Sequence, residues 1–139
     1  MATVFTKIID GEFPGRFVWR DDRCVSFLSI NPLNTGHALV VPIEEVDHWL
    51  DLDPDLNAHL MRVSQFIGTA QQVAFSPARV GLMIAGLEVP HVHLHVVPIN
   101  GVHDLDFANA AADPDPAVMD DARAAILDQL RAAGHDPGV

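Results

Sequence analysis

The sequence predicts one α+β domain in which an antiparallel sheet is accompanied by two main helices. Short β-like segments come first as a hairpin, and long stretches of helical periodicity follow without regular strand–helix alternation. The 139 residues match the length of one domain, and their 49% hydrophobic content suits a packed core. No internal repeat or linker divides the chain, so we expect a single domain over residues 1–139.

The sheet is predicted from five apolar segments. Residues 17–20 and 24–28 flank a short charged turn and predict a hairpin. Residues 37–42 predict a third strand, which its final proline ends. An apolar strand over 80–85 and a last strand over 91–99 complete the set.

Capping residues predict where the two main helices begin. Asp53 can accept backbone N–H bonds as an N-cap, and Pro54 suits the first helical position. Apolar residues then recur at helical spacing to about Ala74. Asp115-Pro116 repeats this pattern before a C-terminal helix that ends at Gly134, within a loop and helix over about 108–134.

Charge and cysteine content exclude several classes of protein. The net charge of −11 disfavours long nucleic acids and anionic membranes, which need a basic surface. A single cysteine, Cys24, excludes an internal disulfide and suits a reducing compartment. The N-terminus lacks the apolar core of a signal peptide, and no apolar run reaches membrane-spanning length. We therefore expect a cytoplasmic protein.

Histidines alternate with apolar residues in the run His91-Val92-His93-Leu94-His95. In an extended chain the three imidazoles share one face and the apolar side chains share the other. Three interpretations are open: hydrogen-bonded structural histidines, a metal site completed by His37 or Glu88, or nucleophilic catalysis at phosphorus.

The run from His91 to Val97 matches the motif of the histidine triad (HIT) superfamily. The segments Phe5–Pro14 and Gly36–Pro42 resemble two further conserved stretches of that family, in the same order and at similar spacing. The chain thus resembles the HIT superfamily over about residues 4–98. The resemblance implies a HIT-like antiparallel sheet that continues across a homodimer, with a nucleotide-binding cleft beside it.

The resemblance also implies roles for individual residues. His93 would attack the α-phosphorus and form a nucleotidyl-histidine intermediate, while His95 would donate to a non-bridging phosphate oxygen. His91 and His37 would orient these two rings. The base and ribose would be lined by Phe5, Ile8, Phe27, Leu28 and Ile30.

The chain departs from the family pattern around the substrate. Ser29 stands where many relatives carry an acid that holds the ribose hydroxyls. Leu87 and Glu88 replace a glutamine and a hydroxyl residue on the leaving-group side. Thr3 and Thr6 occupy the positions of a zinc-binding cysteine pair found in some relatives, so we expect no structural zinc and no cofactor.

These observations predict a HIT-like hydrolase or nucleotidyl transferase that takes a nucleotide or another small phosphorylated substrate. One alternative is a metal-dependent hydrolase built on the same histidines, and another is a non-catalytic nucleotide-sensing module. We also expect a homodimer that forms through the sheet and the helix beginning at Asp53, because a small sheet leaves edges that a partner can cover.

Overall fold

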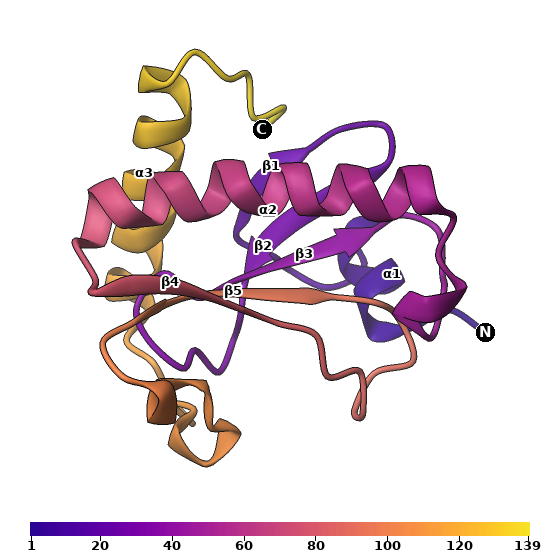
Figure 1. Ribbon diagram of the computed structural model, residues 1–139, viewed down its shortest axis with the longest axis horizontal. Coiled ribbons are helices and arrows are strands. Elements are labelled where there is room, and N and C mark those ends of the chain that lie inside the picture. The colour runs from indigo at the N-terminus through magenta and orange to yellow at the C-terminus, as the bar shows by residue number, and fades with distance from the viewer.

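The computed structural model describes all 139 residues and confirms the predicted α+β class. Five strands form one antiparallel sheet in the order β1-β2-β3-β5-β4 (Figure 1). The strands are β1 (Phe17–Arg20), β2 (Cys24–Leu28), β3 (Ala38–Pro42), β4 (Arg79–Met83) and β5 (Leu94–Ile99). Strand β5 lies between β3 and β4, so the histidine run leads into the interior of the sheet.

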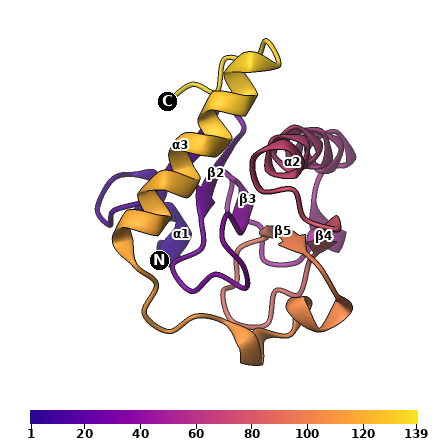
Figure 2. The same ribbon diagram turned by 90° about the vertical axis from the view of Figure 1, so that its left-hand side faces the viewer.

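Two long helices, α2 (Pro54–Phe75) and α3 (Pro116–Ala132), pack against each other and cover one face of the sheet (Figure 2). The short helix α1 (Val4–Ile9) lies on the other side. Three single-turn 3₁₀ helices, η1 to η3, span Trp49–Asp51, Val102–Leu105 and Phe107–Asn109. None of the helices is both long and apolar enough to span a bilayer.

Strand alternation gives the sheet two distinct faces. On β2, Cys24 and Leu28 belong to the larger core against α2 and α3, whereas Val25 and Phe27 belong to a smaller core that contains Phe5 of α1. We call these sides the helix face and the α1 face.

The helix caps agree with the sequence at α3 and differ at α2. Asp115 accepts a hydrogen bond from the backbone N–H of Ala117, as a capping residue should. Asp53 occupies the N-cap position of α2, but its side chain makes no capping hydrogen bond. Its carboxylate lies 3.9 Å from the guanidinium of Arg23 instead, so the predicted capping bond is wrong.

The last strand begins later than predicted, at Leu94 rather than His91. The backbone N–H of Val92 donates to Val46 O, outside the sheet, and that of His91 donates to Val89 O in a tight turn. The alternation still holds, since Val92, Leu94 and Val96 all lie in the larger core.

A buried glutamine fixes the turn that leads into β3. Gln71 of α2 donates from Nε2 to the carbonyl oxygens of Gly36 and Val96, at 2.9 and 2.8 Å. Gly36 has φ +89°, and a Cβ there would collide with the ring of Phe75. Only glycine fits this turn, which places the next residue, His37, against β5.

Candidate functional site

A pocket of about 870 Å³ opens on the α1 face of the sheet. Three of the four predicted catalytic histidines line it: His37, His93 and His95. His91 is fully buried and does not line the pocket. All the predicted substrate-binding residues line it: Phe5, Ile8, Phe27, Leu28, Ser29, Ile30 and Glu88.

The hydrogen bonds of His93 determine which ring nitrogen carries the proton. Its Nδ1 lies 2.7 Å from the carbonyl oxygen of His91. A carbonyl only accepts, so Nδ1 carries the hydrogen and the neutral ring keeps a lone pair on Nε2. The ring of Phe5 packs edge-on against this imidazole, with the ring centroids 4.8 Å apart.

His37 and His95 form a relay with a fixed direction. The backbone N–H of Leu33 donates to His37 Nδ1 at 3.0 Å, so the neutral ring carries its hydrogen on Nε2. That Nε2 lies 2.9 Å from His95 Nδ1 and donates to it. His95 therefore carries its own hydrogen on Nε2, which is left as a donor.

His91 is held at both ring nitrogens below the pocket. Its Nε2 donates to the carbonyl oxygen of Pro42 at 2.7 Å, and its Nδ1 accepts from the hydroxyl of Thr3 at 2.7 Å. Glu45 in turn accepts from the backbone N–H of Thr3 and from the hydroxyl of Thr6. Sequence reasoning missed Glu45, because only the fold brings it to α1.

Thr3 and Thr6 do not suit a zinc ion. Thr3 and Thr6 offer neutral hydroxyls, which bind zinc far more weakly than thiolates do. Both hydroxyls already have partners, in His91 and Glu45. This corner of the fold is built from hydrogen bonds.

Burial keeps the histidines of the site neutral at pH 7. Desolvation lowers the pKa of His37 to about 3 and that of His95 to about 4, with a further contribution from neighbouring histidines. Burial likewise lowers the pKa of His91 and of His93. The directions of hydrogen-bond donation described above apply to neutral rings.

Charged side chains sit at the rim of the pocket. Arg16 is the only lysine or arginine that lines it, and its Nε donates to the Asp120 carboxylate at 2.8 Å. Glu88 is exposed, and its charge opposes the lowering of the His93 pKa. Ser29 accepts from the backbone N–H of Asn31 through its hydroxyl at 3.3 Å.

The segment after η2 closes one side of the pocket, which sequence reasoning did not predict. Asn31 donates from Nδ2 to the carbonyl oxygen of Ala111 at 3.0 Å, which ties this segment to the loop after β2. The ring of Phe107 packs edge-on against His95, with centroids 5.2 Å apart. The additional lining residues from this part of the chain are Phe107, Ala110, Ala111, Ala112 and Asp120. Alanines carry no chemical signal, so the sequence alone gave no means of finding them.

The protein is thus a small α+β domain with a five-stranded antiparallel sheet and a pocket lined by histidines. Residues 10–102 match the model of the HIT domain. The chain belongs to the HIT family.

Relatives agree with this assignment. An uncharacterized HIT-like protein of Borreliella burgdorferi is 38% identical over 102 residues, which cover 68% of this chain and 73% of that protein. An adenylylsulfatase, HINT3 of Arabidopsis thaliana, is 31% identical over 100 residues, covering 68% of this chain and 51% of the plant protein. The crystal structure of a Zn-bound histidine triad family protein from Mycobacterium smegmatis aligns with a TM-score of 0.83 and 26% identity, over 96% of each chain.

Proposed function

We propose that this protein binds nucleotides and hydrolyses or transfers them at the α-phosphate, through a nucleotidyl-histidine intermediate on His93. One observation carries the proposal: His93, with an unprotonated Nε2, and His95, with a protonated Nε2, line one pocket with their ring centroids 4.9 Å apart. A nucleophile and a donor for the developing charge are the two groups that phosphoryl chemistry needs here.

In the first step the lone pair on His93 Nε2 forms a bond to the α-phosphorus. The bond from phosphorus to the leaving group breaks, and the leaving group keeps the electron pair. The attacking ring becomes positively charged, and its Nδ1–H bond to the His91 carbonyl stabilises that charge. His95 donates to a non-bridging oxygen as negative charge builds there.

In the second step a water molecule attacks phosphorus. The phosphorus–nitrogen electron pair returns to Nε2, and the water proton passes to solvent. If another hydroxyl or phosphate replaces the water, the same intermediate gives transfer instead of hydrolysis. A covalent intermediate divides one difficult displacement into two easier ones.

The pocket suits a nucleoside beside the reacting phosphate. Phe5, Phe27 and Leu39 provide an apolar floor next to His93. Ser29 supplies a hydroxyl at the position assigned to ribose recognition, together with the adjacent side chain of Asn31. The adenylylsulfatase among the relatives supports an adenylyl substrate as the first choice for assay.

The hydrogen bonds favour this reading over a metal-dependent hydrolase built on the same histidines. Both ring nitrogens of His91 and both of His37 already have partners. A metal ion bound to either residue would cost it one of these bonds. At His37, the relay would then no longer set the proton position on His95.

The test is turnover of adenosine 5′-phosphoramidate and of dinucleoside polyphosphates by the purified protein, compared with the His93→Ala variant. We expect turnover by the wild type and none above background by the variant. A matched control is His103→Gln, which changes an exposed histidine outside the pocket. Turnover that survives His93→Ala would overturn the proposal.

The same panel tests for a non-catalytic sensor. Glu88 places a carboxylate at the pocket rim, where it repels phosphate unless the leaving group is cationic. Calorimetry with adenosine monophosphate reports binding separately from turnover. Binding without turnover of any substrate would assign the protein as a sensor.

We also propose a homodimer through α2 and the edge strand β4. Strand β4 pairs only with β5, so its other edge is open. Next to it, Met61 and Val73 of α2 and Leu82 of β4 are exposed apolar side chains. Light scattering in low and moderate salt should give twice the 15.1 kDa chain mass, and a monomer mass under both conditions would refute this.

A cytoplasmic location belongs to the same proposal. The sole cysteine, Cys24, is buried and unpaired, as suits a reducing compartment. Fractionation of cells with an antibody to the chain would test it.

A further inference from the structure

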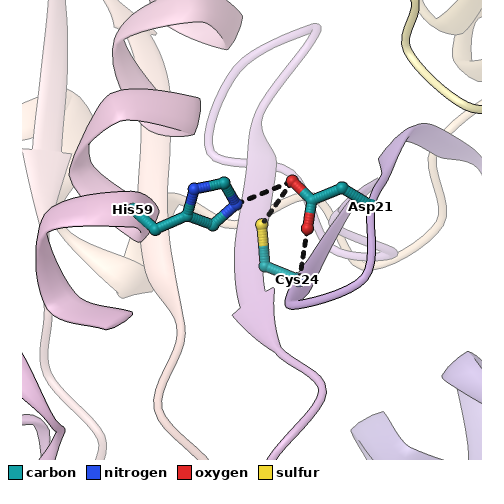
Figure 3. Close-up of side chains that lie close together, drawn as sticks. All are labelled: Asp21, Cys24 and His59. Carbon is teal, nitrogen blue, oxygen red and sulfur yellow. Dashed lines mark hydrogen bonds and ion pairs between the residues drawn. The ribbon is translucent and has the colours of Figure 1, made fainter. Parts of the chain in front are cut away.

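A second cluster of chemistry-bearing side chains lies on the helix face of the sheet. Asp21 and Cys24 come from the β1–β2 hairpin, and His59 comes from α2 (Figure 3). None of the three lines the pocket described above. Cys24 points into the larger core with α2 and α3, so the sheet separates this cluster from the candidate active site.

The side chains of His59 and Cys24 converge on one carboxylate oxygen of Asp21. His59 Nε2 lies 2.7 Å from Asp21 Oδ2, and Cys24 Sγ lies 3.7 Å from the same atom. The sulfur, nitrogen and oxygen atoms all lie within 4.8 Å of one another. The three donor types that zinc prefers therefore surround one point.

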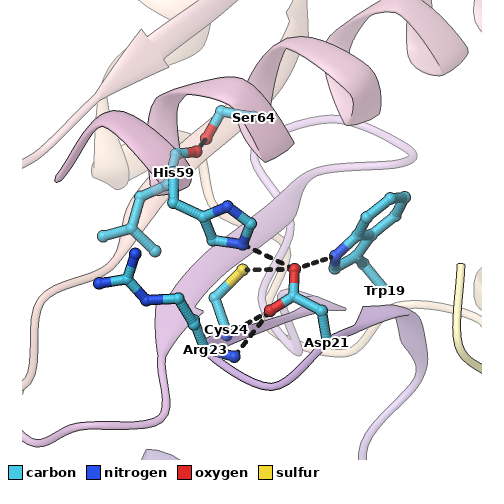
Figure 4. Close-up of polar contacts among 7 residues, drawn as sticks. Trp19, Asp21, Arg23, Cys24, His59 and Ser64 are labelled. Atoms are coloured by element: carbon cyan, nitrogen blue, oxygen red, sulfur yellow. Dashed lines mark hydrogen bonds and ion pairs between the residues drawn. The ribbon is translucent and has the colours of Figure 1, made fainter. Parts of the chain in front are cut away.

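The carboxylate is fixed before anything binds. Asp21 Oδ1 accepts from the backbone N–H groups of Arg23 and Cys24, each at 2.8 Å. Trp19 Nε1 donates to Oδ2 at 2.8 Å (Figure 4). Such supporting hydrogen bonds orient carboxylate ligands in metal sites.

The cluster has both a protected and an open side. Cys24 is fully buried, whereas the side chains of Asp21 and His59 are 23% and 21% exposed. An ion can therefore enter from the carboxylate and imidazole side. Solvent reaches the same side of the cluster, so water is available as a further ligand.

We propose that Asp21, Cys24 and His59 form a binding site for one Zn²⁺ ion, with water in the fourth position. The charges balance, because a carboxylate and a thiolate together neutralise the divalent ion. When the ion binds, the Cys24 thiol proton leaves to solvent and the sulfur bonds to zinc. The proton on His59 Nε2 is replaced by zinc, and the neutral ring carries its hydrogen on Nδ1 instead.

Binding the ion requires the distances between the ligand atoms to change. Zinc–ligand bonds of about 2.0 Å to nitrogen and oxygen and 2.3 Å to sulfur place tetrahedral ligand atoms about 3.3 to 3.6 Å apart. The sulfur–oxygen separation of 3.7 Å is already close to this range. The His59–Asp21 separation of 2.7 Å must lengthen, which rotation of the His59 side chain on the surface of α2 allows.

The test titrates Co²⁺ into tag-free protein, because cobalt substitutes for zinc and is visible in absorption. Cys24 is the only cysteine in the chain, so a thiolate-to-cobalt charge-transfer band reports this residue alone. We expect the band to saturate at one equivalent and to disappear when Zn²⁺ is added. No band at one equivalent would overturn the proposal.

Three variants test the ligand set: His59→Gln, Asp21→Asn and Cys24→Ser. We expect each to abolish the band or to weaken Zn²⁺ binding by at least about tenfold. The matched control, His103→Gln, should bind as the wild type does. A band that persists in both His59→Gln and Asp21→Asn would show a thiol that binds cobalt without this site, and would also overturn the proposal.

Stability provides a readout that does not depend on the band. One equivalent of Zn²⁺ should raise the melting temperature of the wild type and leave that of His59→Gln unchanged. His59 is partly exposed, so this variant should keep its fold, which circular dichroism checks. An equal rise in both proteins would place the ion elsewhere and refute the assignment.

Discussion

Two hydrogen-bond networks that contain histidine lie on opposite faces of one sheet. They differ in whether the last group in the network keeps a free donor. On the α1 face, the relay from Leu33 through His37 ends in a free donor on His95. On the helix face, His59 and Cys24 both donate to Asp21, and the network closes on itself. Burial alone does not separate the two, because Cys24 is as buried as His37. The direction of donation does.

Because of this difference, substitutions on the two faces should affect different properties of the protein. Free ring nitrogens in a pocket are available to a substrate, so changes on the α1 face should alter turnover. A closed network ties the β1–β2 hairpin to α2, so changes there in metal-free protein should alter stability. The following predictions either break or sharpen this separation.

Acid should have the largest effect of all, because it unfolds the protein. The folded pKa values of about 3 for His37 and about 4 for His95 lie below 6.5, the ordinary value. The unfolded chain therefore binds more protons below pH 6.5, and the free energy of unfolding falls as pH falls toward these folded values.

Denaturant titrations between pH 7 and 5 measure this effect above the range in which most carboxylates titrate. The slope should be shallower in His37→Gln than in His103→Gln. Equal slopes in the two variants would contradict the assignment of the acid sensitivity to the buried relay.

His93→Ala should lower kcat/KM by about a thousandfold or more, because it removes the nucleophile. The variant should lose far less free energy of unfolding than of transition-state stabilisation, since the imidazole lines the pocket on one side. Stopped turnover followed by mass spectrometry should show a nucleotidyl adduct on the wild type and none on the variant. An adduct on another residue would move the nucleophile elsewhere.

His95→Ala should lower kcat by about a hundredfold, the usual cost of losing one donor to a developing oxyanion. His95→Gln keeps an N–H donor and should recover part of that loss. If alanine and glutamine variants were equally impaired, donation by His95 would not be its role.

Asp21→Asn should destabilise the metal-free protein by about 1 to 3 kcal/mol and leave kcat unchanged. The asparagine side chain has only one oxygen, so either the backbone N–H groups of Arg23 and Cys24 lose their acceptor, or Trp19 and His59 do. Urea unfolding in the presence of a chelator measures the loss. A drop in kcat with unchanged stability would join the two networks that the comparison separates.

The sequence predicted the sheet and both long helices for physical reasons that act locally, whereas the expected pocket residues came from the resemblance to the HIT family. Alternation placed Val92, Leu94 and Val96 in the core, and proline with aspartate marked where the helices begin. The strand boundary at Leu94 could not be predicted, because it depends on a hydrogen bond to the distant Val46.

The parts that the sequence missed depend on long-range packing. Glu45 reaches Thr3 and Thr6, and Asn31 holds Ala111, over separations that no local pattern encodes. The Asp21–Cys24–His59 cluster was missed for the same reason, since His59 comes from a different element. Cys24 and His59 had no motif to connect them.

The smallest effect should come from Thr3→Val, which keeps the shape of the side chain and removes its hydroxyl. The lost bond to His91 Nδ1 is worth about 1 kcal/mol, which corresponds to about a fivefold fall in kcat/KM. Burial lowers the pKa of His91, and the Thr3 hydroxyl favours the neutral ring further by donating to it. Without that donor the pKa of His91 rises, so the acid limb of the pH–activity profile should move to higher pH. Thr3→Ser restores the hydroxyl and should return both the rate and the profile toward the wild type. A merely structural role for Thr3 would lower the rate without moving the acid limb, and that result would remove Thr3 and Glu45 from the set of positioning residues.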